Sequence, residues 1–108
     1  MPVEGASARI DAAIRRWPGV SPQPHRFGGT EYLLGEREIG HVHGDHLVDT
    51  PYPKGIRDRL VADGRVEASH MIPQSGWVSL YLKGPNDVER AIEMLRLSYD
   101  LATGKTSQ

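Results

Sequence analysis

The chain of 108 residues contains 38% hydrophobic and 25% charged residues, which is the balance of one ordinary globular domain. The formal net charge of -1 and the lack of a Lys/Arg stripe argue against a nucleic-acid partner, because phosphate contacts require a basic surface. Cysteine is absent, so the sequence excludes disulfides, thiolate metal sites and cysteine nucleophiles.

Neither a targeting segment nor a membrane span is predicted. The first residues, Met1–Gly5, lack the basic and apolar pattern of a signal peptide. No apolar run approaches the roughly 20 residues that a membrane helix requires. We therefore expect a cytoplasmic protein with one domain over residues 1–108, ordered from 6 to 102 and ending in a disordered tail at 105–108.

The first predicted element is a helix over 6–17. Its apolar side chains fall on one helical face and are Ile10, Ala13, Ile14 and Trp17. Ser7 is a suitable N-cap, and Pro18-Gly19 ends the helix. Residues 21–24, Ser-Pro-Gln-Pro, are predicted to form a linker turn, because two prolines interrupt regular backbone hydrogen bonding.

A β-hairpin is predicted next, with strands at 26–34 and 37–43 joined by Gly35-Glu36. Glycine at the first turn position favours a type II′ turn. Gly28-Gly29 is interpreted as a bulge in the first strand. Alternation in the second strand predicts one face with Ile39, His41 and His43 and a second face with Glu38, Gly40 and Val42.

The middle of the chain is predicted to hold a loop, a helix and a short strand. Residues 44–51 are polar and are expected to form the loop. The helix covers 53–63, with Pro53 in its first turn and Gly64 at its C′ position. Residues 66–71 are expected to form the short strand.

The last two predicted elements are a strand over 77–83 and a helix over 86–102. The strand alternates between one face with Val78, Leu80 and Leu82 and another with Trp77, Ser79, Tyr81 and Lys83. Asn86 and Glu89 have the spacing of a capping box, and Gly104 ends the helix.

This order predicts an α+β fold with an antiparallel sheet of three to five strands and about three helices packed on one face. The alternation in 77–83 is typical of a sheet that is covered on one side only. The other face of the sheet is therefore expected to be partly open, and open faces of small domains are common sites for ligands or partners.

Four stretches of the chain resemble the bacterial luciferase domain family. They are Arg37–Asp45 followed by Asp49, Pro51 and Pro53; Ile56–Val61; His70, Pro73 and Ser75–Ser79; and Ala91–Tyr99. The resemblance covers about residues 26–102. The family shares its domain with fungal luciferase, which oxidises a hydroxylated pyrone-type luciferin with O₂ and no added cofactor, and most bacterial members are small proteins of unassigned function.

A weaker likeness links the chain to the MmcQ/YjbR-like family. In that family a His and a Trp precede a strand, and a Ser-Tyr pair lies near the end of the last helix. Here His70, Trp77 and Ser98-Tyr99 have similar relative places. That family is often labelled DNA-binding, and the acidic balance of this chain gives the label no support.

The luciferase-domain resemblance implies an oxygenase that removes a proton from a phenol or pyrone without a cofactor. Its base would be His43 or His70, because imidazole titrates near neutral pH, and Asp49 would fix the tautomer. Arg57 would hold the enolate oxygen. The predicted substrate-binding residues are Trp77, Tyr81 and Ser75. In the alternative interpretation, Trp77 covers a sheet edge and Arg57 forms a surface ion pair with Asp58 or Asp49.

A second hypothesis is a His-bound divalent metal such as zinc, iron, nickel or copper. His41 and His43 lie two residues apart on a strand, so their imidazoles point the same way about 7 Å apart. His46 is the expected third ligand, with His70, Asp45 and Asp49 as alternatives. In the competing interpretation, these histidines only bond backbone carbonyls and the aspartates of 44–51.

A third hypothesis is a binding or interaction module without catalysis. Trp77, Ser79 and Tyr81 would form its contact surface, and that surface would join two copies in a homodimer. Across all three hypotheses the expected partner is a small organic molecule or a protein, and neither nucleic acid nor membrane is expected.

Overall fold

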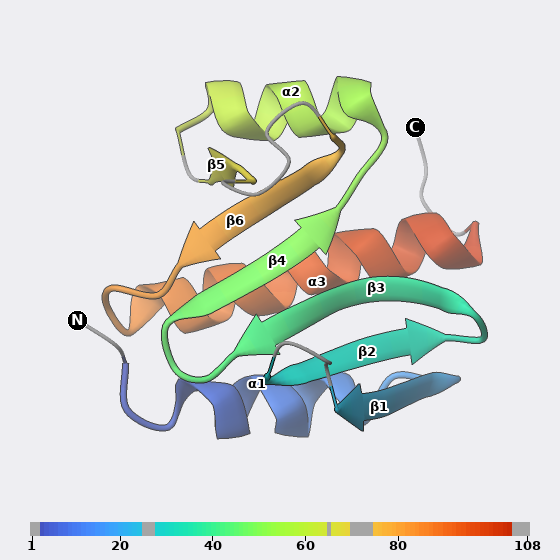
Figure 1. Ribbon diagram of the computed structural model, residues 1–108, viewed down its shortest axis with the longest axis vertical. Coiled ribbons are helices and arrows are strands. Elements are labelled where there is room, and N and C mark those ends of the chain that lie inside the picture. Colours follow the sequence, from blue (N-terminus) through green and yellow to red (C-terminus); the bar gives the residue numbers. More distant parts are fainter. Residues whose placement is uncertain (1–2, 25–27, 65, 70–74, 105–108) are drawn as a thin grey trace.

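The computed structural model describes residues 3–24, 28–64, 66–69 and 75–104 (Figure 1). Their elements follow the order α1 (Ala6–Ile14), β1 (Val20–Pro24), β2 (Thr30–Leu34), β3 (Arg37–His43), β4 (Leu47–Pro51), α2 (Lys54–Ala62), β5 (Glu67–Ala68), β6 (Trp77–Tyr81) and α3 (Asn86–Thr103). The predicted α+β class is confirmed. The sheet of the described residues has six strands, one more than the expected maximum of five.

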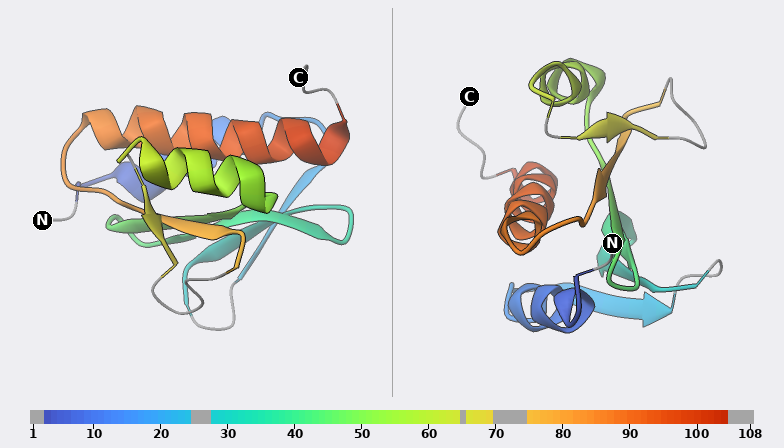
Figure 2. Two further views of the ribbon diagram at one scale, coloured as in Figure 1. Left: turned by 90° about the horizontal axis from the view of Figure 1, so that it is seen from above. Right: turned by 90° about the vertical axis from the view of Figure 1, so that its left-hand side faces the viewer.

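The six strands form one open antiparallel sheet with the order β1-β2-β3-β4-β6-β5. Figure 2 shows α1 and α3 side by side on one face, with α2 on the same side at the β5–β6 end. No helix of the described ranges covers the opposite face. In the part of the chain that the structure describes, no helix is long and apolar enough to cross a lipid bilayer.

The hydrophobic core lies between the sheet and the helices α1 and α3. It includes Ile10, Ile14, Val42, Val48, Val78, Leu80, Val88 and Leu95. Each such side chain contributes about 1.5–3 kcal/mol when it leaves water completely. This one-sided core explains why the apolar residues of β6 alternate with the residues of the open face.

Helix α1 is shorter at its C-terminus than predicted, and its N-terminus is capped by another segment. The helix ends at Ile14 and not at Trp17, because Pro18 disfavours helical backbone in the residue before it. The predicted cap, Ser7, makes no side-chain cap. Instead the carboxylate of Asp45 accepts hydrogen bonds from the backbone N–H groups of Ser7 (2.8 Å) and Gly5 (3.2 Å).

The predicted linker turn at 21–24 is wrong, because these residues belong to strand β1. Pro22 and Pro24 are paired with Tyr32 and Thr30 of β2. β1 is an edge strand, and prolines two residues apart can both turn their missing N–H side away from the partner strand. The same prolines prevent another chain from adding to this edge.

The β2–β3 hairpin is confirmed, and Gly35 has the positive φ (65°) that its turn position requires. The predicted bulge lies elsewhere. Gly28-Gly29 precedes β2, whereas the register steps from Tyr32↔Gly40 to Leu33↔Glu38 and leaves Ile39 as the extra residue of β3. The bulge reverses the predicted faces before Gly40, so Ile39 is buried in the core and Glu38 lies on the side of His41.

The predicted loop at 44–51 is also wrong, because 47–51 form the central strand β4. Val48 is buried in the core, and Asp49 is 8% exposed as a residue on the opposite face. A short strand with a carboxylate at its centre has little sequence signal. Its burial is explained by the hydrogen bonds that Asp49 accepts, described below.

The remaining helix and strand predictions are close to the structure. Gly64, with φ 79°, follows the end of α2, and Gly104 ends α3 as predicted. Asn86 caps nothing with its side chain; the carboxylate of Asp87 accepts the N–H groups that precede α3 instead. Residues 70–71 of the predicted strand and the predicted tail at 105–108 lie outside the described residues.

Candidate functional site

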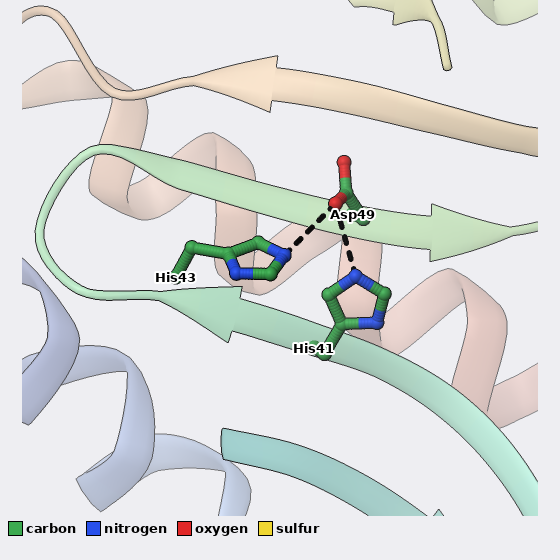
Figure 3. A group of neighbouring side chains, drawn as sticks. All are labelled: His41, His43 and Asp49. Carbon is green, nitrogen blue, oxygen red and sulfur yellow. Dashed lines mark hydrogen bonds and ion pairs between the residues drawn. The ribbon is translucent and has the colours of Figure 1, made fainter. Parts of the chain in front are cut away.

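Two histidines and an aspartate meet on the open face of the sheet (Figure 3). His41 and His43 are alternate residues of β3, so both side chains leave the same face. Asp49 of β4 is the direct cross-strand partner of His41. One ring nitrogen from each histidine and one Asp49 oxygen all lie within 4.8 Å of one another.

The Asp49 carboxylate is the centre of this group. Its Oδ2 lies 2.9 Å from Nε2 of His41 and 3.2 Å from Nε2 of His43. Its Oδ1 accepts a hydrogen bond of 2.6 Å from the hydroxyl of Ser79, which is the cross-strand partner of Asp49 on β6. These three contacts satisfy a carboxylate whose side chain is only 12% exposed.

His41 is bound on both ring nitrogens. Its Nδ1 lies 2.7 Å from Oε2 of Glu38, opposite the Nε2 contact with Asp49. Glu38 can reach the ring only because the bulge at Ile39 places it on the open face. We refer to Glu38, His41, His43 and Asp49 together as the His/Asp cluster.

The charges of the His/Asp cluster shift the pKa values of its members. Burial acts against the charged imidazolium of His41, but hydrogen bonds and charges from Asp49 and Glu38 outweigh it and raise its pKa to about 9. Burial likewise acts to raise the pKa of Asp49, yet the contacts with His41 and Ser79 lower the pKa overall. At neutral pH His41 therefore carries both ring protons, and its imidazolium lies between the carboxylates of Glu38 and Asp49.

A polar row across the sheet passes through His41 and Asp49 of the cluster. The directly paired residues on successive strands are Gln23, Glu31, His41, Asp49, Ser79 and Glu67. Direct partners in an antiparallel sheet share a face, so the row runs across all six strands on the uncovered side. Each of these side chains has polar neighbours on the adjacent strands. Asp49 and Ser79 can therefore be buried on a face of the sheet that no described helix covers.

Aromatic side chains lie on both sides of the cluster along the strands. The Trp77 ring packs against His41, with ring centroids 5.1 Å apart and planes tilted by 34°. Tyr81 lies at the other end of β6 and is paired with Leu47, which is in turn paired with His43. Trp77 and Tyr81 are both half-buried.

Three of the other predicted site residues that the structure describes, His46, Arg57 and Ser75, are not members of the cluster. His46 is exposed in the β3–β4 turn, and among the described residues the third group beside His41 and His43 is Asp49, one of the alternatives named from the sequence. Arg57 lies on α2, where its NH1 group pairs with Asp58 at 2.7 Å. Ser75 accepts the Trp77 backbone N–H at 3.1 Å. His70 lies outside the described residues.

The sequence-based site lacks two members of this arrangement, Glu38 and Ser79. Ser79 is predicted on the correct face, but only as part of a contact surface. Glu38 is assigned to the wrong face, because strict alternation does not allow for an extra residue. The signal that reveals it is the Ile39-Gly40 pair, since a glycine inside a strand often marks a bulge.

Comparison with known proteins identifies the family of this chain. No match was found among curated proteins or among solved structures. A model of the luciferase domain matches residues 36–98, which is more than half of the 108 residues and includes the whole His/Asp cluster and Ser79. The chain therefore belongs to the luciferase domain family.

Proposed function

We propose that this luciferase-domain protein binds a small hydroxylated organic molecule at the His/Asp cluster and takes a proton from its acidic hydroxyl group. The observation that carries the proposal is the meeting of two imidazoles and a carboxylate on the face of the sheet that no described helix covers. Convergent polar groups of this kind are typical of sites for small ligands.

The roles within the cluster follow from its contacts. Asp49 orients the His43 ring through Nε2, and the His43 side chain, 22% exposed, is more accessible than that of His41. His43 is therefore the group that accepts the substrate proton. His41, held between Glu38 and Asp49, places a positive charge beside the oxygen that loses this proton.

The aromatic neighbours support a flat substrate. Trp77 and Tyr81 lie on either side of the cluster along β6, and both leave part of their surface open. Aromatic rings provide large apolar contacts to a planar ligand. Phenols and hydroxylated pyrones combine such a ring with an acidic hydroxyl, and the family membership favours an oxygen-dependent reaction on their anions.

The proposal is tested by calorimetric binding of triacetic acid lactone, a small hydroxylated pyrone, to the chelator-treated chain without a polyhistidine tag. The wild type is expected to bind it, and His43→Gln to weaken binding by about tenfold or more, because a hydrogen bond to a charged group is lost. His46→Gln is the matched control and is expected to bind like the wild type. Equal binding by wild type and His43→Gln would contradict the proposal.

A further inference from the structure

The three atoms that meet at the centre of the cluster are all good metal ligands. They are Nε2 of His41, Nε2 of His43 and Oδ2 of Asp49. We infer that these atoms form a binding site for one divalent first-row transition-metal ion, with Zn²⁺ and Fe²⁺ as the ions that fit its donor set. Ion binding stands on this geometry, and only its use on a substrate rests on the proposed function.

The separations between the atoms suit a single ion. Zinc binds imidazole nitrogen and carboxylate oxygen at about 2.0–2.2 Å, so two ligand atoms of one ion lie about 3–3.5 Å apart. Asp49 Oδ2 is already 2.9 Å and 3.2 Å from the two imidazole nitrogens. The full set lies within 4.8 Å, so small side-chain rotations bring all three atoms around one centre.

The groups behind these atoms are those that a metal site requires. Metal-binding histidines usually donate their second ring N–H to a carboxylate, and metal-binding carboxylates are themselves hydrogen-bonded. Glu38 lies 2.7 Å from Nδ1 of His41, which keeps the proton there and leaves Nε2 as the ligand. Ser79 bonds the Asp49 oxygen that faces away from the histidines.

The charge and the donor types select the class of ion. With both imidazoles neutral, Glu38 and Asp49 supply two negative charges, which balance a divalent cation. The ion takes the place of the proton between His41 Nε2 and Asp49. Two nitrogen donors and one oxygen favour zinc or iron(II) over Mg²⁺ and Ca²⁺, which prefer oxygen alone.

Three protein ligands leave coordination positions for small molecules. A bound ion at this place would polarise an acidic hydroxyl oxygen directly. In the metal-bound chain His43 serves as a ligand of the ion, and the substrate binds at the same place beside the cluster as in the proposed function.

The test is a metal titration of the tag-free, chelator-treated chain. Calorimetry measures the binding of Zn²⁺, and visible absorption measures the binding of Co²⁺. One ion per chain is expected, with no binding of Mg²⁺. His43→Gln is expected to weaken Zn²⁺ binding at least tenfold. Glu38→Gln is expected to weaken it by about 10–100-fold, because Glu38 is not a ligand but orients His41 through Nδ1. His46→Gln is the matched control, because it removes an imidazole from the neighbouring turn.

Unchanged Zn²⁺ affinity in His43→Gln, or an equal loss in His46→Gln, would overturn the assignment to this cluster, as would absence of binding in the wild type. Circular dichroism of each variant shows whether it folds. His43 is the more exposed of the two cluster histidines, so His43→Gln disturbs the packing less than a change at His41 would. Lactone binding without metal binding defeats this inference alone, whereas metal binding with no lactone binding to either the metal-free or the metal-loaded chain defeats the proposed function alone.

Discussion

At the residue scale, Asp49 is the carboxylate to which the other polar side chains at the centre of the open face are bonded. A carboxylate in a central strand is costly to bury unless donors surround it, and Asp49 has His41, His43 and Ser79. Each donor comes from a position that strand pairing fixes, so the cluster is a consequence of register. A shift of one residue between β3 and β4 would turn both imidazoles into the core.

The contact between His43 and Asp49 predicts coupled energetics. Single variants His43→Gln and Asp49→Asn and the double variant are expected to show an interaction energy of about 0.5–3 kcal/mol in urea unfolding, because the two side chains share a contact. The pair His46→Gln and Asp49→Asn is the control and is expected to be additive. Additive free energies for the first pair would show that the side chains do not meet.

Gly40 illustrates how one residue allows the bulge and the helix to coexist. Its φ is 156°, and an added Cβ would lie 2.5 Å from Cδ2 of Leu95 on α3 and 3.0 Å from the Asp49 carbonyl oxygen. Leu95 is fully buried, so it has little room to yield. Glycine at this position therefore allows α3 to approach the sheet directly behind the His/Asp cluster.

We predict that Gly40→Ala lowers the free energy of unfolding by about 1–3 kcal/mol, the usual cost of overpacking a core. Gly55→Ala in α2 is the matched control, since an added Cβ there meets nothing within 4 Å. It is expected to be neutral or to stabilise the chain by up to about 1 kcal/mol. Equal unfolding midpoints for the two variants in urea would contradict this account of Gly40.

At the element scale, α1 is attached to the sheet by polar contacts as well as by its apolar face. The hydroxyl of Tyr32 on β2 donates to Asp11 at 2.6 Å, and Arg15 pairs with the same carboxylate. Burial acts to raise the pKa of Asp11, but these partners lower it overall. The ionised form of Asp11 therefore stabilises the folded chain.

The sign of this effect predicts its pH dependence. The folded-state pKa of Asp11 lies below its usual value of 3.8, so the stabilisation is present above that value and is lost as pH falls through the folded pKa. The stability difference between wild type and Asp11→Asn is expected to favour the wild type at about pH 7 and to shrink at about pH 2. Urea unfolding at the two pH values measures it; a difference that grows on acidification would contradict the sign.

The elements that sequence reasoning predicted correctly have strong periodic signals. The helix around Ile10 and Ile14, the β2–β3 hairpin and α3 all combine a clear apolar face with a glycine or proline boundary. Strands β1 and β4 were missed because tertiary context overrides their composition: an edge position tolerates the prolines, and partners from β3 and β6 satisfy Asp49.

The sequence also indicates part of the geometry of the His/Asp cluster. The alternation of His41 and His43 on a strand is a local pattern, so the sequence places both imidazoles on one face. The identity of the third group depends on how β4 pairs with β3, which no local pattern contains. For this reason the sequence leaves His46 and its alternatives, Asp49 among them, open for the third place, and the structure brings Asp49 to both imidazoles.

At the scale of the whole molecule, the three helices that the structure describes lie on one side of the sheet and leave the polar row on the other. The luciferase-domain match begins at residue 36, so α1, β1 and β2 lie outside it, yet Ile10 and Ile14 of α1 are fully buried in the same core. The Asp45 carboxylate also joins the α1 N-terminus to the β3–β4 turn beside His43. The N-terminal segment therefore packs into the core behind the sheet and is bonded to the turn that joins β3 to β4.

Asp45→Ala is the change that tests this support. Its carboxylate accepts two backbone N–H groups at the start of α1, and loss of such a cap costs about 0.5–2 kcal/mol. Thermal unfolding is expected to show this loss, and Asp58→Ala, on the exposed surface of α2, is expected to show less. A smaller effect at position 45 than at 58 would contradict the role of the cap.

The central claim is that His41 and His43 form the binding site together, and histidine-labelled NMR during titration with triacetic acid lactone tests it most directly. We predict that the imidazole signals of His41 and His43 both shift as the lactone binds to the metal-free chain, while that of His46 stays in place. Signals that move only at His46, or none that move at saturation, would contradict the account.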